Sequence, residues 1–317
     1  MAQTLSINEA QTFISTYLDA SWEIDDPRPL AYTDYMIVKN MERGEFVDYR
    51  IAGFGKLVER GELEDIDYDQ LEFGETETTK PKNWGRGFKV SEEVIEDLAD
   101  SPWGGEIRAK LGAYGDCVSR WRRSADWTVE QECANKLLNG TSTAADYILR
   151  DSIAWFGSHV TLKNPTLTQV NLATHASLSA TTINNMATTL NLQIDDKGDY
   201  ISKSGRNKLV VSESDATRAW EIMNTTGQVD SANNNANTVK KHKWDVVENA
   251  YLNVNAATYA GYFVLREGVH GAHWFWRKKP VFAKDNDFDA IAMKYRARMR
   301  GVAKVRWWQG AVGDNGS

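Results

Sequence analysis

Two histidines in the last quarter of the chain, His270 and His273, come nearest to a metal site in type and spacing. Zinc sites use histidines at such short spacing, but they need further cysteine, histidine or carboxylate ligands to complete the coordination set. Neither a cysteine nor a pair of carboxylates stands close to these histidines in the sequence. The aromatic run Trp274-Phe275-Trp276 follows directly and indicates a buried strand. We therefore expect no metal and no cofactor.

Other short patterns that could carry chemistry lack the context that the chemistry requires. Gly53-Phe54-Gly55 and Gly85-Arg86-Gly87 are rich in glycine, but neither matches the strand–GxxxxGK[ST]–helix pattern of a phosphate-binding loop. No Ser, Cys or His stands in a recognisable nucleophile motif. Cys117 and Cys133 fall in a segment of helical periodicity and are expected to be reduced thiols. We predict no catalytic residue and expect a protein that is not an enzyme.

The composition is that of a folded protein without a membrane span. The 317 residues are 42% hydrophobic and 26% charged, enough for one large or two modest domains with a core. No run of 18 apolar residues occurs, so no membrane contact is expected. The first residues lack the basic and apolar regions of a secretory signal, which predicts a protein that stays in the cytosol of the producing cell.

The net charge of −7 is distributed unevenly along the chain. Residues 1–100 hold 23 acidic and 10 basic side chains, whereas residues 240–306 hold 6 acidic and 14 basic ones. Such a split suits a protein whose acidic part docks on the basic part of another copy, because opposite potentials steer the encounter and set its register. Two unrelated solvated faces would explain the same counts.

Residues 44–90 are predicted to form a long two-stranded ribbon. Within residues 44–58, the apolar Val47, Tyr49 and Ile51 alternate with Asp48 and Arg50, as in a half-buried strand, and residues 71–90 run back. The segment between the two strands is too acidic for a core and predicts an exposed tip. Its acidic residues are Glu62, Glu64, Asp65, Asp67 and Asp69. Because an isolated ribbon is marginal in water, we expect this one to lie on a neighbouring subunit.

Two helices are predicted from caps and apolar stripes. A capping box at Ser6 and Glu9 begins the first, which ends before Pro27; residues 1–40 should form an arm that docks on the rest of the fold or on a neighbour. The second extends from Pro102 to the pair Asn139-Gly140, about 35 residues or about 50 Å. It carries a basic cluster off its apolar stripe, formed by Arg108, Lys110, Arg120, Arg122 and Arg123.

The remainder is predicted to be mixed α/β structure ending in a very long strand. Helices are expected near residues 180–192 and 215–223, and strands near 208–211, 260–265 and 273–276. From residue 291 to 307 apolar and basic side chains alternate with period two, which places the basic side chains on one face of a strand of roughly 55 Å. The members of this face that we expect to meet a partner are Lys294, Arg296, Arg298 and Arg300.

The order of these elements resembles that of the major capsid proteins of tailed bacteriophages, which have the Hong Kong 97-like fold. The elements are an arm, an acidic ribbon, a long helix, an inserted α/β region and a long final strand. The local stretches that are similar to the Mu-like head-subunit branch are residues 68–75 (YDQLEFGE), 84–93 (WGRGFKVSEE), 279–282 (KPVF), 287–289 (DFD) and 295–298 (YRAR). The order of elements covers nearly the whole chain. The expected fold class is therefore α+β.

This resemblance implies a division of the chain. It makes residues 1–40 an N-terminal arm and residues 41–90 an extended loop that overlaps a neighbouring subunit. Residues 91–180 and 280–317 would form the peripheral domain with the spine helix, and residues 181–279 the axial domain. With only about 40 residues before the extended loop, no fused scaffolding region is expected. Nothing singles out a lysine and an asparagine for the covalent crosslink known in one branch.

The function that the resemblance implies is self-assembly of hexamers and pentamers into an icosahedral shell that encloses double-stranded phage DNA. The expected partners are copies of the chain, portal and scaffolding proteins, decoration proteins, and packaged DNA through weak contacts. The expected location is the virion, after assembly in the host cytoplasm. Two alternatives use the same residues: the shell of an encapsulin-like nanocompartment, and a nucleic-acid-binding protein that uses the basic strand face. An enzyme with an unrecognised site is a further alternative.

Two hypotheses assign residues to this function. In the first, the acidic tip lies across a neighbour and pairs with the basic strand face, each exposed pair contributing only about 0–1 kcal/mol. In the second, the basic cluster on the long helix faces packaged DNA, and the alternative is an ordinary solvated helix face.

Overall fold

The computed structural model describes residues 7–23, 30–66, 68–100, 105–201, 204–227, 235–253, 261–287 and 292–314. The chain forms two compact units. Unit 1 comprises Met1–Leu30, Pro81–Val129 and Trp276–Val302, and unit 2 comprises Ala31–Lys80, Glu130–Phe275 and Ala303–Ser317. Each unit is therefore built from segments that are far apart in the sequence. Three long elements belong to both: α4 (Gly105–Leu138), β10 (Ala272–Asp287) and β11 (Ala292–Val305).

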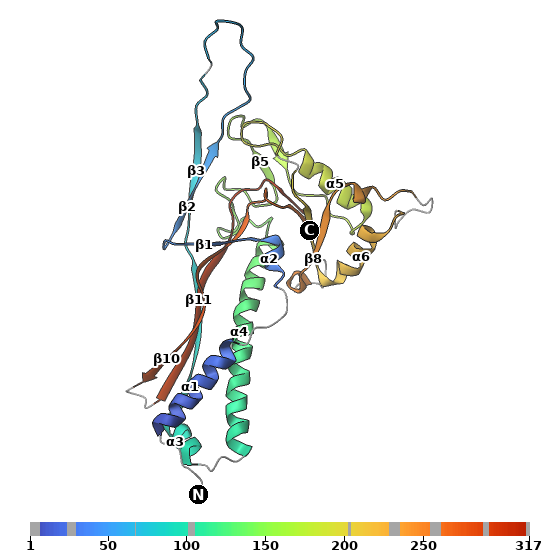
Figure 1. Cartoon of the computed structure of the whole chain (residues 1–317). Coiled ribbons are helices and arrows are strands. Elements are labelled where there is room, and N and C mark those ends of the chain that lie inside the picture. Colours follow the sequence, from blue (N-terminus) through green and yellow to red (C-terminus); the bar gives the residue numbers. More distant parts are fainter. Residues whose placement is uncertain are drawn as a thin grey trace. The chain divides into compact units, whose positions relative to one another are not determined.

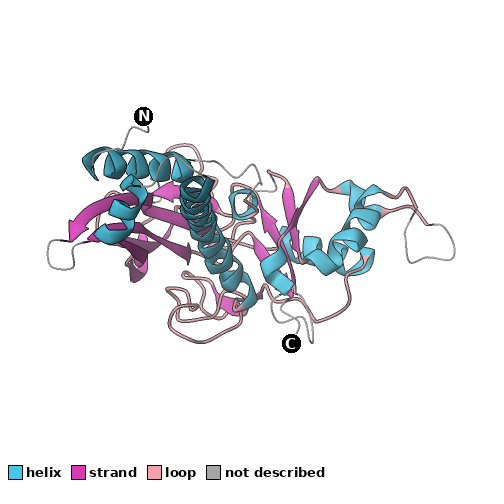
Figure 2. Cartoon of the chain, turned by 90° about the horizontal axis from the view of Figure 1, so that it is seen from below, coloured by secondary structure: helices cyan, strands magenta, loops and turns pink. Residues whose placement is uncertain are grey.

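Unit 1 packs helices on long strands (Figure 2). Beside its parts of α4, β10 and β11 it contains α1 (Ile7–Glu23), β4 (Lys82–Ser91) and α3 (Glu92–Asp100). One buried apolar cluster joins these elements, and its members are Ile14, Leu18, Val90, Ile95, Val118 and Tyr295. The apolar stripe of α1 is thus buried within its own unit. The N-terminal helix therefore docks on its own chain.

The long strand predicted over residues 291–307 is confirmed as β11, but it is not the last element, because the short strand β12 (Ala311–Asp314) follows it. β11 pairs antiparallel with β4, with Tyr295 opposite Phe88 and Met299 opposite Trp84. It lies in a four-stranded sheet of order β1-β10-β11-β4, in which β1 is Ile37–Asn40. Tyr295 and Met299 are buried while Arg296 and Arg298 are exposed, as the period-two pattern predicts.

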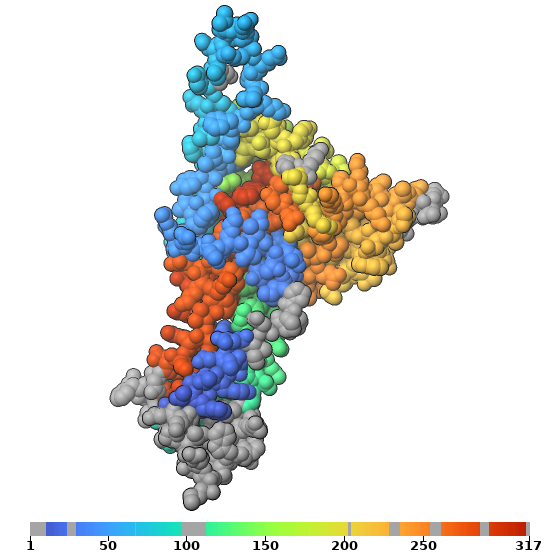
Figure 3. All heavy atoms as spheres, in the orientation of Figure 1, coloured from blue at the N-terminus to red at the C-terminus, as the bar shows by residue number. Residues whose placement is uncertain are grey.

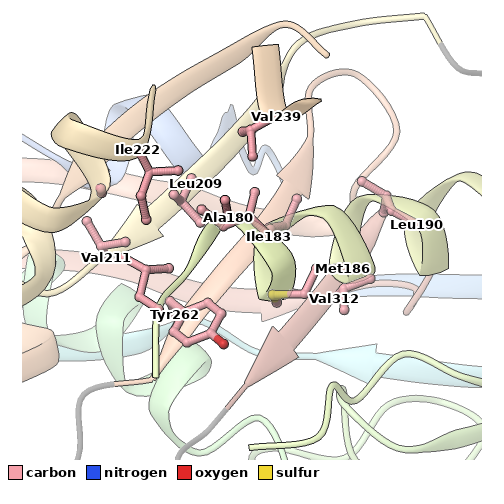
Figure 4. Close-up of a cluster of buried hydrophobic side chains, with 13 residues drawn as sticks. Ala180, Ile183, Met186, Leu190, Leu209, Val211, Ile222, Val239, Tyr262 and Val312 are labelled. Carbon is pink, nitrogen blue, oxygen red and sulfur yellow. The ribbon is translucent and has the colours of Figure 1, made fainter. Parts of the chain in front are cut away.

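Unit 2 contains a second four-stranded sheet, of order β12-β9-β7-β8. Four of its elements lie where the sequence patterns predict them, and they are β7 (Asn207–Val211), β9 (Tyr262–Arg266), α5 (Ala180–Asn191) and α6 (Glu213–Asn224). The sequence patterns do not predict the other two strands of this sheet, β8 (Trp244–Glu248) and β12 (Ala311–Asp314). Strand β7 is parallel to β8 and antiparallel to β9. Ile183 and Met186 of α5, Ile222 of α6 and Leu209 and Val211 of β7 share one core cluster (Figure 4).

The smaller elements of unit 2 are α2 (Tyr32–Tyr35), the hairpin strands β5 (Ser158–Val160) and β6 (Thr168–Val170), and the 3-10 turns η1 (Thr238–Lys241) and η2 (Ala250–Asn253). α2 is tied to the end of α4, because the Glu130 carboxylate accepts the backbone N–H of Tyr32 at 3.1 Å.

The predicted ribbon exists in unit 2, but it is shorter than expected. β2 (Phe46–Ala52) pairs antiparallel with β3 (Glu72–Thr79), and residues 53–71 form a long loop between them (Figure 1). The expectation that the whole of residues 71–90 returns along β2 is wrong, because β4 pairs with β11 instead. The ladder ends before Pro81, which has no backbone N–H to donate.

Candidate assembly surfaces

The ribbon exposes its apolar face and buries its charged face. Along β2, the side chains of Asp48, Arg50 and Ala52 are buried, whereas those of Val47, Tyr49 and Ile51 are exposed. The period-two alternation expected from the sequence is therefore present. The apolar side is the one that this single chain leaves open to solvent.

Strand β3 extends the exposed apolar face. Phe73 is 69% exposed and lies directly opposite Ile51 in the register. Tyr49 and Val47 continue the row along β2. We call Val47, Tyr49, Ile51 and Phe73 the outer ribbon face. Large apolar side chains gathered on an exposed surface are typical of a protein-binding site.

Arg50 explains why the charged side of β2 faces inward. Its guanidinium donates two hydrogen bonds to Asp196, at 2.6 and 3.2 Å, and one to the carbonyl oxygen of Val160 at 2.7 Å. Burial lowers the pKa of Arg50, but the hydrogen bond and charge of Asp196 outweigh it and raise the pKa above its ordinary value. A two-pronged, charge-assisted bond of this kind holds a strand in one orientation.

A second ion pair binds β2 to the end of the chain. Asp48 accepts hydrogen bonds from Nε and Nη2 of Arg306, at 3.0 and 2.7 Å. Arg150 lies 3.6 Å from the same carboxylate and donates to the carbonyl oxygen of Tyr49 at 2.7 Å. On β3, Glu77 pairs with Lys304. Two of the basic residues from the predicted strand face, Lys304 and Arg306, therefore hold the ribbon of their own chain.

The loop between β2 and β3 is exposed (Figure 3). It carries apolar as well as acidic side chains. Leu63 is 97% exposed and stands between the exposed Glu62 and Glu64, with Asp65 following. Glu64 accepts the backbone N–H of Gly61 at 2.7 Å, which closes the turn. These acidic residues are available to a partner.

Asp69, another acidic residue of the predicted tip, differs from these. Asp69 binds within its own chain, because its carboxylate accepts the backbone N–H of Gly55 at 2.7 Å and lies 3.2 Å from Nζ of Lys197. The pKa of Asp69 is lowered, first by the Gly55 hydrogen bond and then by Lys197. Asp67 lies outside the described residues.

The predicted basic partner face lies in unit 1. Arg296 and Arg298 are exposed on β11, while Lys294 and Arg300 are half-buried. Arg298 also lines a groove of about 280 Å³. Three tryptophans and a second arginine line the same groove, namely Trp22, Trp84, Trp121 and Arg86. A groove with aromatic walls and two guanidinium groups is suited to an apolar segment that carries carboxylates.

The basic cluster predicted on the long helix is not one uniform face. Arg120 is exposed, but Arg122 donates to Asp126 at 2.7 Å and lies over the ring of Trp22 at 5.9 Å. Arg123 is half-buried. Arg108 and Lys110 belong to α4, and their side chains are outside the described part of the structure.

The two histidines that most suggested a metal site are core residues. His270 is 2% exposed and His273 is 1% exposed. The ring of His273 stacks on Phe275 at 5.4 Å and meets Trp307 edge-on at 5.6 Å. Among the described residues, no three His, Cys, Asp or Glu side chains are grouped to hold a metal ion. None of the described helices is long and apolar enough to cross a membrane.

Sequence reasoning missed the residues that fix the ribbon. The period-two pattern predicts that Arg50 and Asp48 lie on the solvent side of β2, it places Arg306 on a basic face that meets a partner, and it assigns nothing to Asp196 and Lys197. The sequence contains only part of the information needed. Two opposite charges on the same side of one strand can be buried together if each has an oppositely charged partner elsewhere in the chain. Those partners lie about 100 to 260 positions away, so periodicity alone does not identify them.

Three features are typical of a protein that binds other protein chains. They are the exposed apolar face of the ribbon, the charged loop and the aromatic groove. The family model for phage capsid proteins matches residues 74–312, more than half of the chain. The chain belongs to this family. It is a phage capsid protein, a structural component of the virion and not an enzyme.

Solved structures with a similar fold were also found. The capsid of cyanophage P-SCSP1u is 10% identical, with 92% of this chain and 89% of that chain covered and a TM-score of 0.48. The procapsid of bacteriophage JBD30 is 15% identical, with 97% and 74% covered and a TM-score of 0.46. A virus-like particle from Pyrococcus furiosus is 8% identical, with 95% and 97% covered and a TM-score of 0.47. None of the curated proteins matches the chain.

Proposed function

We propose that this phage capsid protein is the major capsid protein of a tailed bacteriophage. Its copies would assemble as hexamers and pentamers into an icosahedral shell around double-stranded DNA. The branch would be the Mu-like one of the Hong Kong 97-like fold, as the short stretches in residues 68–93 suggest. Assembly would take place in the host cytoplasm, with portal and scaffolding proteins, and decoration proteins as further partners.

This proposal rests on one observation: the ribbon exposes its apolar face and buries its charged face. Burying a large apolar side chain contributes about 1.5–3 kcal/mol, yet four such side chains are left open on the outer ribbon face. Arg50 and Asp48 hold them there through four hydrogen bonds to Asp196 and Arg306. A second copy of the chain that covers this face would recover the apolar burial.

The proposed place of the acidic tip is the basic face of β11 on another copy. Arg298 belongs both to this face and to the groove that Trp22, Trp84 and Trp121 line. Leu63 and its acidic neighbours Glu62 and Glu64 match the groove in polarity and charge. Each exposed pair contributes only about 0–1 kcal/mol, but a closed shell repeats the contact in every subunit, and weak contacts let errors dissociate.

The test of the outer ribbon face is assembly of a double variant, Ile51→Ser with Phe73→Ser. We expect the concentration needed for shell formation, measured by light scattering and negative-stain imaging, to rise about tenfold or more, because central apolar anchors dominate interfaces. Thr76→Ser is the matched control, since Thr76 is exposed on β3 opposite Tyr49. Circular dichroism should show both variants folded. Normal shells from the double variant would refute the proposal.

The acidic tip is tested by charge reversal and exchange. Glu62→Lys with Glu64→Lys should slow assembly, and so should Arg296→Glu with Arg298→Glu, because each leaves like charges facing each other. The two sets combined should restore assembly in part. Equal defects that simply add in the combined variant would exclude a direct contact. Purified particles that hold protein cargo and no DNA would favour a nanocompartment instead.

A further inference from the structure

The turn at residues 194–200 is a rigid support beside the ribbon in unit 2. It is closed by a β-bridge between Ile194 and Tyr200, and the Asp195 carboxylate accepts the backbone N–H groups of Lys197 and Asp199, each at 2.9 Å. Gly198 at its tip has a φ of +95°, a conformation that favours glycine. Backbone closure and the glycine fix the directions in which the neighbouring side chains leave the turn.

Three charged side chains of this turn bind the ribbon at three places. Asp196 binds Arg50 on β2. Lys197 binds Asp69 at the return of the loop, and Asp199 binds Lys56 at its start, with Nζ 2.8 Å from the carboxylate. Asp69 also accepts the backbone N–H of Gly55, next to Lys56, so these two pairs hold opposite legs of the loop at one level. The turn thus binds both β2 and the base of the loop.

The three ion pairs differ in burial. Both partners of the Arg50–Asp196 pair are buried or nearly so, the side chain of Lys197 is 1% exposed against 38% for Asp69, and Lys56 is 81% exposed. Salt screens exposed pairs much more than buried ones. The outer pairs therefore weaken first when ionic strength rises or a competing charge arrives, while the Arg50 pair stays closed.

We propose that Asp196, Lys197 and Asp199 are positioning residues that hold the ribbon of their own subunit in the direction from which it binds a neighbouring copy, and that the pairs open from the loop inward. Holding the ribbon in advance lowers the entropy lost when it docks. Lys197 is the best of the three residues for a test. Its ammonium group is buried, and it meets only residues at the return of the loop, namely Asp69 and the carbonyl oxygen of Gln70, among the contacts described. The part of the proposal that concerns assembly rests on the proposed function.

Hydrogen–deuterium exchange on unassembled subunits tests the support directly. Lys197→Met keeps the length of the side chain and removes the charge. We expect the amides of Gly55 and Gln70, which donate to Asp69, to exchange about five- to tenfold faster, because contacts that share a partner are coupled, while those of α5 and β7 do not change. Arg206→Met is the matched control: it breaks the Arg206–Asp245 pair, 2.7 Å long and in the same unit, without touching the ribbon.

A charge exchange separates positioning from mere loss of structure. Lys56→Asp and Asp199→Lys should each speed exchange of the Gly55 amide about twofold, and the double variant should return it to the wild-type rate. In 1 M salt the wild-type Gly55 amide should speed up while the amides of β2 do not. Unchanged exchange in Lys197→Met, or a double variant no better than the singles, would overturn the proposal.

Assembly kinetics complete the test. Lys197→Met should assemble more slowly than wild type, and Arg206→Met at the wild-type rate, both followed by light scattering. If Lys197→Met assembled at the wild-type rate, the proposed role of Lys197 in assembly would be wrong. If the wild-type chain formed no shells, the proposed function would fail, while the exchange measurements would still decide whether the turn holds the ribbon.

Discussion

At the scale of single residues, buried charge and buried imidazole determine which side of an element faces inward. Arg50 and Asp48 turn β2 so that its apolar side points outward, because each finds a charged partner with good geometry inside unit 2. Buried ion pairs add little net stability, but breaking one by removing a partner costs about 3–5 kcal/mol. Their effect here is to select one of two faces of a strand.

Unit 2 should lose stability in mild acid because of His270 and His273. Burial, the first cause in both cases, lowers each pKa to about 4. The charges of His273 and Lys208 add to the lowering at His270. At His273 the hydrogen bond to the carbonyl oxygen of Gly271 opposes the lowering, and the charges of Lys39 and Arg306 add to it. The folded state keeps both rings neutral, whereas the unfolded chain protonates them near pH 6.5. The free energy of unfolding should therefore be constant above pH 6.5 and fall between pH 6.5 and 4, by roughly 3 kcal/mol for each ring.

Chemical denaturation across this pH range checks the prediction. His270→Phe should flatten the slope between pH 6.5 and 4 whatever its effect at pH 8, and His270→Asn offers a smaller replacement that does not titrate. A slope identical to wild type in a folded variant would show that His270 contributes nothing.

Phe156 should be sensitive to a single methyl group added beside it. Its ring stacks on Trp155 and Phe263, and a Cβ at Gly313 would lie 2.6 Å from it. Gly313→Ala should lower the free energy of unfolding by about 1–3 kcal/mol through overpacking, measured by thermal denaturation. Gly44→Ala is the control, since a Cβ there meets nothing within 4 Å. Equal melting temperatures for the two variants would contradict the packing argument.

At the scale of elements, local sequence specifies each long helix and strand, but individual close contacts set the place where two elements meet. α1 crosses α4 at Gly115, where Tyr17 and Ser21 occupy the space that a side chain would need. The apolar stripe of α1 predicts that the helix is buried somewhere. The small residue on α4 decides where.

Gly115→Ala should therefore displace α1 from α4. The added Cβ would lie 2.5 Å from Cε1 of Tyr17 and 2.9 Å from Oγ of Ser21. We expect a loss of about 1–3 kcal/mol in the free energy of unfolding, together with faster amide exchange in α1. Gly112→Ala, in the same helix and open on all sides, should instead stabilise the protein by up to about 1 kcal/mol. Stabilisation by both substitutions would refute the close crossing.

At the scale of the whole molecule, the charges of this capsid protein serve contacts between protein segments. Arg306 and Lys304 bind the ribbon of their own chain, and Arg122 binds Asp126. The net charge is −7. A net negative charge disfavours tight binding of phosphate groups, because such binding needs many uncompensated cations.

Isolated subunits should accordingly bind duplex DNA only weakly. We expect a dissociation constant no tighter than about 1 µM at physiological salt, within the range of non-specific binding, and a shallow dependence on salt concentration. Fluorescence anisotropy with a labelled duplex measures both. Submicromolar binding with a steep salt slope would support the nucleic-acid-binding alternative.

Local patterns in the amino-acid sequence are enough to predict the main helices, the long strand and much of their order. Caps and apolar periodicity predict α1, α4, α5 and α6, and the alternation around Tyr295 and Met299 predicts β11 and its exposed Arg296 and Arg298. These features are local: neighbours three, four or two positions apart create them. The acidic loop and its exposure followed from composition in the same way.

Which face of the ribbon is buried, where the ribbon ends and which charges are paired depend on contacts between distant segments of the folded chain. Period two is symmetrical between the two faces of a strand, so Val47 and Tyr49 predict burial with no information on what covers them. The choice depends on Asp196, Lys197 and Arg306, whose approach to β2 and its loop is set by chain folding over long sequence separations. Electrostatic pairing is non-local for this reason, whereas helix and strand periodicity is contained within each segment.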